Sequence, residues 1–119
     1  MFDISVEGTF SAAHQVKGYP GDCADIHGHT YRISVKVRTN SLNKLGMAMD
    51  FRRVKKELNK ILKKLDHTTL NKLPFFKKHN ATAEWVAVYI HNEMKKKIKA
   101  ITSVTVWEGQ NNTVTYYEA

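Results

Sequence analysis

Three histidines and one cysteine lie close together in the first quarter of the chain. His27 and His29 are separated only by Gly28, Cys23 comes four residues before the pair, and His14 lies a short way upstream. Three imidazoles are the usual protein ligands of a catalytic zinc ion, which keeps a fourth position open for water or substrate. These residues therefore predict a metal that polarises a substrate, beside a separate thiol that does proton chemistry on it.

The spacing of His27 and His29 favours a shared site. Alternate residues of a strand point to the same face, about 7 Å apart along the chain, so two rings in such a strand could reach one ion. Gly28 has no side chain and lets another group come close. The alternative is that both histidines are ordinary polar residues at the start of a strand. The neighbouring His14 and Cys23 favour the metal site.

Composition limits the class of protein. The chain has 119 residues, of which 42% are hydrophobic and 25% charged, as in an ordinary globular domain with one modest core. No apolar run approaches the ~20 residues that span a bilayer, and the N-terminus lacks the features of a signal peptide. One cysteine cannot form an internal disulfide. We therefore expect a single domain over residues 1–119 in a reducing cytoplasm.

The chain is basic, with a net charge of +8 from 19 Lys and Arg against 11 Asp and Glu residues. Most of the excess lies in residues 52–64 and 95–99. This charge could attract a nucleic acid or a small phosphorylated substrate. The alternative is a pair of solvated, lysine-rich helix faces. No nucleic-acid motif with base-reading or stacking residues stands out.

Hydrophobic patterning predicts the order strand, strand, helix, helix, strand, strand. Strands are expected over residues 2–13, 30–39, 101–108 and 113–118, with a tight turn at Asn111-Asn112. If the second strand starts early, parity places His27 and His29 on its inward face. Residues 68–80 are expected to be irregular. Helices grouped between two strand pairs predict an α+β fold, with a four-stranded antiparallel sheet and two helices on one face.

The two predicted helices have apolar residues at helical spacing. The first is capped by Asp50 and ends near Asp66, and the second begins near Thr82. Their apolar faces are predicted to contain, in order, Phe51, Val54, Leu58, Ile61, Leu62 and Leu65, and then Val86, Tyr89, Ile90, Met94 and Ile98. His79 and His91 are expected at the surface, without a role.

Two further positions could carry chemistry. Asp66 and His67 form an adjacent carboxylate–imidazole pair that suits acid–base work near neutral pH. The alternative is that His67 contacts the carbonyls at the helix end. Glu108 ends a strand on an apolar face, where a carboxylate is costly without partners. It could accept two adjacent N–H groups of a guanine-like ring, or it could simply bend to water.

Together these features resemble the 6-pyruvoyl-tetrahydropterin synthase and 6-carboxy-tetrahydropterin synthase family. The resemblance covers essentially the whole chain, with the motifs in the family's order and approximate separations. It rests on Phe10-Ser11-Ala12-Ala13-His14, Cys23, His27-Gly28-His29-Thr30-Tyr31, Leu65-Asp66-His67-Thr68-Thr69-Leu70-Asn71, Thr82-Ala83-Glu84 and Trp107-Glu108.

The resemblance implies a tunnelling fold whose subunits join through their sheets into rings, commonly a hexamer of two stacked trimers. It also implies active sites between subunits and 7,8-dihydroneopterin triphosphate as substrate. Carried over by position, the implied zinc ligands are His14, His27 and His29, the implied thiolate base is Cys23, and its implied proton-transfer partners are Asp66 and His67. Glu108 would anchor the pterin, and Thr82 and Glu84 would help line the pocket. Ala81 stands where the family often has proline.

The position of the cysteine separates branches of the family. Three residues lie between Cys23 and His27, which resembles bacterial 6-carboxy-tetrahydropterin synthases of the queuosine route; animal-type 6-pyruvoyl enzymes place the cysteine further upstream. Relatives that make a folate precursor have glutamate in its place. The resemblance thus implies a zinc-dependent lyase that forms 6-carboxy-5,6,7,8-tetrahydropterin and releases triphosphate and acetaldehyde. The alternatives are triphosphate elimination to the 6-pyruvoyl product, or a structural zinc module with Cys23 as fourth ligand. No membrane or direct nucleic-acid contact is expected.

Overall fold

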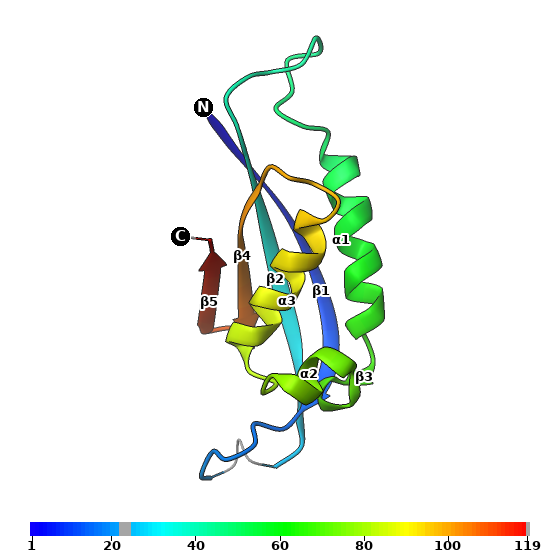
Figure 1. The fold of residues 1–119 in the computed structure, drawn as a ribbon, viewed down its shortest axis with the longest axis vertical. Coiled ribbons are helices and arrows are strands. Elements are labelled where there is room, and N and C mark those ends of the chain that lie inside the picture. Colours follow the sequence, from blue (N-terminus) through cyan, green and yellow to red (C-terminus); the bar gives the residue numbers. More distant parts are fainter. Residues whose placement is uncertain (22–24, 119) are drawn as a thin grey trace.

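The computed structural model describes residues 1–21 and 25–118 of this chain. A layer of helices covers one face of a layer of strands, in a body with extents of 53 × 26 × 26 Å (Figure 1). None of the described helices has the length and apolarity that crossing a membrane would require. The elements are β1 (Phe2–His14), β2 (His27–Thr39), α1 (Phe51–Leu65), β3 (Thr68–Thr69), the 3-10 helix η2 (Leu70–Lys72), α2 (Pro74–Lys78), α3 (Ala83–Lys95), β4 (Ile101–Glu108) and β5 (Asn112–Tyr117).

The sheet has the strand order β3-β1-β2-β4-β5. β1 and β2 form an unbroken antiparallel ladder from Phe2 opposite Thr39 to His14 opposite His27. β4 and β5 continue the sheet in antiparallel fashion, whereas β3 adds two residues in parallel to β1. The predicted α+β fold is confirmed, with a fifth, very short strand.

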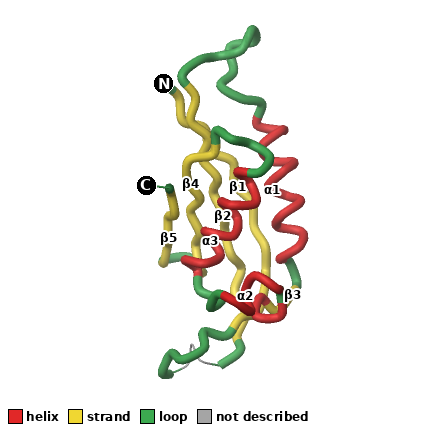
Figure 2. The backbone as a smooth tube through the Cα atoms, in the orientation of Figure 1, coloured by secondary structure: helices red, strands yellow, loops and turns green. Residues whose placement is uncertain are grey.

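The helices lie on one face of this sheet (Figure 2). Asp50 caps α1 by accepting from the backbone N–H of Arg52 at 2.9 Å. Gly8 on β1 lets α1 approach closely, because a Cβ there would lie 2.6 Å from Cδ1 of Leu62. The core between the layers includes Val54, Leu58 and Leu65 of α1, Val86, Ile90 and Met94 of α3, and Tyr31, Ile33, Val35, Val104 and Val106 of the sheet.

Two local predictions were wrong. Residues 68–80 are not irregular, because they hold β3, η2 and α2, and Pro74 begins α2 at a position where its missing N–H costs nothing. Elements this short hold too few residues for a periodic pattern of apolar side chains to be recognised in the sequence. The turn between β4 and β5 spans residues 109–111, one to two residues earlier than predicted, and Gly109 adopts the positive φ of 76° that the turn requires.

Three side chains also differ from the prediction. Phe51 is 59% exposed, because it is the first residue of α1 and lies beyond the reach of the core. Ile98 is buried as expected, but it lies after the end of α3. His91 is fully buried rather than on the surface, and its ring meets that of Tyr116 edge-on at 5.0 Å. It shares the buried face of α3 with Ala87 and Met94.

Candidate functional site

Strand pairing brings the three predicted histidines together. His14 lies directly opposite His27, and His29 lies opposite Ala12, two residues before His14. All three rings also lie near one another, with centroids 4.6–5.0 Å apart. One nitrogen from each ring lies within 4.8 Å of the other two. This trio could therefore hold a metal ion, with β1 and β2 as its rigid support.

Backbone carbonyls orient two of the three rings. Nδ1 of His14 lies 2.6 Å from the carbonyl oxygen of Ala81, and Nδ1 of His27 lies 2.7 Å from that of Asp25. Because a carbonyl only accepts, each Nδ1 carries a proton, and in the neutral form of each ring Nε2 then presents a lone pair. Such carbonyl contacts are the usual outer support of metal-binding histidines.

The facing nitrogens fit a cation between them. Nε2 of His14 and Nε2 of His27 are 3.1 Å apart. Between two neutral rings with protonated Nδ1 atoms, two lone pairs face each other and repel. Two nitrogens bound at 2.0–2.1 Å to a tetrahedral ion would be about 3.3 Å apart, close to the separation observed.

His29 supplies a buried ring nitrogen to the trio. Its Nε2 has no hydrogen-bond partner among the described residues, although Oε1 of Glu108 lies 3.4 Å away. Burial lowers the pKa of His29, and the nearby carboxylate of Glu108 only partly opposes this shift. Buried polar atoms are rarely left unsatisfied, so this one is open to a ligand. A lowered pKa also favours the neutral ring that binds metals.

Glu108 lies between the histidine trio and a small pocket. It ends β4, where it pairs with Tyr31 and with Asn112. It also lines a pocket of about 190 Å³ together with Glu84 of α3 and residues 112–114 of β5. The structure therefore places Glu84 and Glu108 on one pocket, and Glu108 also approaches His29. Thr82 is engaged elsewhere, because its hydroxyl caps α3 by accepting from the N–H of Trp85 at 3.2 Å.

The hydroxyl of Tyr31 is a group near this site that the sequence analysis missed. It is buried and has no hydrogen-bond partner among the described residues, while the ring stacks on Phe10 at 4.7 Å. Burial, followed by the charge of Glu108, raises the pKa of Tyr31, so the hydroxyl stays protonated. Strand alternation identified Tyr31 only as a core residue. The signal that could have placed it near the site was its position two residues after His29, on the same face of the strand.

Asp66 and His67 form a connected pair just after α1. Oδ1 of Asp66 accepts from the N–H of Ser11 at 2.8 Å, and Oδ2 lies 2.8 Å from Nδ1 of His67. The Ser11 bond, followed by that with His67, lowers the pKa of Asp66. His67 has a φ of 57°, unusual for a residue with a side chain. Its ring therefore contacts Asp66 rather than the last carbonyls of α1.

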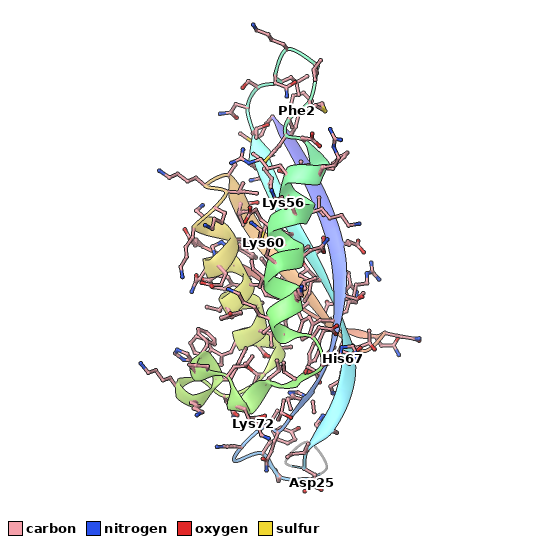
Figure 3. All side chains as sticks on the ribbon, turned by 90° about the vertical axis from the view of Figure 1, so that its right-hand side faces the viewer. Phe2, Asp25, Lys56, Lys60, His67 and Lys72 are labelled. Atoms are coloured by element: carbon pink, nitrogen blue, oxygen red, sulfur yellow. The ribbon has the colours of Figure 1, made fainter. Side chains whose placement is uncertain are left out.

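This pair lies at the β1 edge of the sheet. The side chain of His67 is 84% exposed, and Figure 3 shows it at that edge. His67 lines a shallow groove of about 420 Å³ with Thr68, residues 11–13 and residues 28–30. The pair is thus separate from Glu84 and Glu108, which lie toward β5. Cys23 lies outside the described residues.

The basic residues of α1 lie on its exposed side. Figure 3 shows Lys56 and Lys60 on the side of the helix that faces away from the sheet. Lys60 is paired with Glu57 at 3.5 Å, and the remaining basic residues of the helix are exposed. The basic face of α1 is therefore exposed to solvent. This agrees with the prediction of a lysine-rich, solvated helix face.

Comparisons with known proteins identify relatives of this chain. The profile of the family described as 6-pyruvoyl tetrahydropterin synthase matches residues 3–119. A 6-carboxy-5,6,7,8-tetrahydropterin synthase of Haemophilus influenzae is 32% identical, over 99% of this chain and all of its own length. A dihydroneopterin monophosphate aldolase of Pyrococcus furiosus is 33% identical over 89% of each chain. The solved structure of the 6-pyruvoyl tetrahydropterin synthase of Caenorhabditis elegans superposes with a TM-score of 0.91, at 30% identity, over 99% of this chain and 96% of that one.

Proposed function

The chain belongs to the 6-pyruvoyl tetrahydropterin synthase family, and from this premise we propose that it is a zinc-dependent lyase acting on 7,8-dihydroneopterin triphosphate. The observation that carries the proposal is the convergence of three imidazole nitrogens beside Glu108, one of them buried and without a hydrogen-bond partner in the part of the chain that the structure describes. Three neutral imidazoles with a free fourth position are the ligand set of a catalytic zinc site.

We assign the roles residue by residue. Zinc held by His14, His27 and His29 would lower the pKa of the substrate's side-chain hydroxyls and polarise the developing carbonyl. Cys23 takes a proton from that side chain as a thiolate. His67, oriented by the Asp66 carboxylate 2.8 Å away, exchanges protons with the substrate oxygens or the thiol.

Glu108 is proposed to hold the pterin ring. A pterin presents its 2-amino group and a ring N–H side by side, and one carboxylate can accept from both. The small pocket beside Glu108 supplies a place for this contact, and Glu84 lines the same pocket. Thr82 takes part by fixing the start of α3, the helix that carries Glu84.

We further propose a ring assembly with active sites between subunits. β1 and β5 are the outer long strands of the sheet and run in opposite directions, so β5 of one copy could pair with β1 of the next in antiparallel fashion. Exposed strand edges favour such pairing. The β1 edge carries His67, whereas Glu108 lies toward β5 at the same end of the sheet. Edge pairing would therefore bring the Asp66–His67 pair of one copy toward the pocket of its neighbour.

For the product, we propose 6-carboxy-5,6,7,8-tetrahydropterin, formed with release of triphosphate and acetaldehyde in the queuosine route of the cytoplasm. The support is the three-residue spacing between Cys23 and His27 and the similarity to the Haemophilus influenzae synthase. The same residues would also serve the shorter reaction that ends at the 6-pyruvoyl pterin.

Product analysis tests this proposal directly. The purified, zinc-loaded protein is incubated with 7,8-dihydroneopterin triphosphate, and the products are identified by mass spectrometry together with an assay for acetaldehyde. We expect the 6-carboxy pterin and equimolar acetaldehyde. A 6-pyruvoyl product without acetaldehyde would assign the shorter reaction. An absence of turnover, with a zinc–sulfur bond to Cys23 seen by X-ray absorption, would instead identify a structural zinc module.

A further inference from the structure

Two asparagines bind the backbone that follows His14. Nδ2 of Asn71 donates to the carbonyl of Gln15 at 2.8 Å, and Oδ1 of Asn71 accepts from the N–H of Gln15 at 2.8 Å. Asn80 repeats the arrangement at Lys17, with both bonds at 3.0 Å. Each asparagine therefore satisfies one donor and one acceptor of a single residue, as a neighbouring strand would do.

These contacts hold His14 from the C-terminal side. On its N-terminal side, Ala12 and Ala13 pair with β3. β1 ends at His14, and the side chain of Asn71 then takes over the pairing at Gln15. The backbone is thus held on both sides of the buried histidine, by the sheet before it and by the asparagine side chains after the sheet has ended.

Asn80 also connects to the carbonyl that orients the His14 ring. Its Oδ1 accepts a second bond, from the N–H of Ala81 at 3.2 Å, and its own carbonyl accepts from the N–H of Thr82 at 2.8 Å. The carbonyl of Ala81 in turn lies 2.6 Å from Nδ1 of His14. Asn80 thereby links two groups that hold the His14 imidazole. One is the backbone that follows His14, and the other is the Ala81 carbonyl that accepts from Nδ1 of His14.

The paired bonds at these two positions require the side chain of asparagine. Only a carboxamide offers a donor and an acceptor side by side at this reach; an aspartate would place a carboxylate against a carbonyl, and a glutamine would be one methylene too long. Gln15 and Asn71 are half-buried, so leaving the backbone groups of Gln15 unpaired would be costly, whereas the bonds between Asn80 and Lys17 are exposed and act by fixing geometry. Neither bond pair belongs to the pterin pocket or to the Asp66–His67 pair.

We propose that Asn71 and Asn80 are positioning residues of the metal centre, which hold His14 so that its Nε2 faces His27 and His29. This inference rests on the proposed zinc site. Outer-shell groups that orient a ligand typically change metal affinity by 10–100-fold when removed. We therefore expect Asn71→Ala and Asn80→Ala each to weaken zinc binding within that range, although neither residue contacts the ion.

The test measures zinc affinity by chelator competition in the full-length variants, with Asn92→Ala as the matched control. Asn92 is exposed on α3, away from the trio, and the control should bind zinc as the wild type does. The absorption spectrum of the cobalt-substituted protein reports ligand geometry independently, and we expect it to change in both variants. If circular dichroism shows that an alanine variant does not fold, serine replaces the asparagine at that position and is judged by the same criteria, because its shorter side chain does not offer a donor and an acceptor side by side at this reach.

A double-mutant cycle separates positioning from general stability. If Asn80 acts through His14, adding Asn80→Ala to His14→Ala should not weaken the residual zinc binding further. Unchanged zinc affinity and cobalt spectra in the single variants, with a lower melting temperature alone, would overturn the proposal. Failure of the wild type itself to bind zinc would instead refute the proposed function, so the two failures are distinguishable.

Discussion

The Nε2 atoms of His14 and His27 face each other at 3.1 Å across the ladder between β1 and β2. Both rings donate from Nδ1 to a carbonyl, so in their neutral forms the two Nε2 atoms face each other with lone pairs that repel. A cation between them would replace this repulsion with two bonds. The three candidate ligands are therefore brought together by the strand register of β1 and β2.

Replacing His27 tests the metal site. We expect about one zinc per chain in the wild type and close to none in His27→Ala, because two imidazoles hold zinc far more weakly than three. The measurement is elemental analysis after dialysis. His79→Ala is the control, since His79 stacks on Trp85 outside the trio, and it should keep its zinc. Undiminished zinc in His27→Ala would contradict the ligand assignment.

Replacing Cys23 tests the separation of base and metal. We expect Cys23→Ala to retain zinc while kcat falls by at least about 100-fold, because general-base groups typically contribute 10²–10⁴-fold. Steady-state kinetics and elemental analysis on the same preparation check both parts. Loss of zinc together with activity would show that the thiol is a ligand.

Replacing Glu108 tests the pterin anchor. Glu108→Gln keeps the shape but turns one acceptor into a donor that faces a donor of the pterin. Losing a charge-assisted hydrogen bond costs about 1.5–3 kcal/mol, so pterin affinity should fall roughly 10- to 150-fold, as measured by calorimetry. Zinc content should stay intact despite the 3.4 Å approach to His29. Glu118→Gln, at the exposed end of the chain, is the matched control.

Asp66 should produce a pH-dependent stability. Its pKa is lowered in the folded protein, chiefly by the Ser11 N–H, so the ionised carboxylate stabilises the fold above its unfolded pKa of about 3.8. That contribution is lost as pH falls through the lower, folded pKa. Metal-free wild type should therefore exceed Asp66→Asn in free energy of unfolding at pH 7, and the difference should shrink below pH 4.

Urea unfolding at a series of pH values measures this difference. His67→Ala leaves the Ser11 bond in place and should keep most of the stability advantage over Asp66→Asn. A difference between wild type and Asp66→Asn that did not change between pH 7 and pH 3 would contradict the assignment of the Ser11 bond as the main cause.

The free strand edges predict association. Light scattering at micromolar protein should give a mass several times that of one 13.7 kDa chain, with a trimer or hexamer as the expected species. A proline in place of the exposed Thr115 would disturb the edge strand β5 and should weaken the assembly. A stable wild-type monomer would contradict the proposed ring.

The sequence predicted the features that repeat along the chain. Alternation predicted β2 and the shared face of His27, His29 and Tyr31, and helical spacing predicted α1 and α3. The burial of His91 could also have been predicted, because His91 falls at helical spacing with Ala87 and Met94. Its polar residue type led instead to the prediction of a surface position. Periodicity is a reliable guide because burial repeats with the geometry of the element.

Other features could not be read from the sequence. The bonds of Asn71 and Asn80 reach 56 and 63 residues back along the chain and leave no periodic trace. The two-residue β3 exists only because the chain after α1 returns to the edge of β1. The contact between His29 and Glu108 likewise depends on the pairing of β2 with β4.

The left-handed backbone at His67 has a consequence for which residues this position can tolerate. With φ at 57°, glycine or asparagine would fit the backbone at least as well as histidine, whereas valine or isoleucine would be strained. Only histidine also supplies an imidazole to the Asp66 carboxylate. In a library of all substitutions at position 67, selection for folding should therefore enrich residues that tolerate a positive φ, such as glycine and asparagine. Selection for turnover should instead enrich histidine.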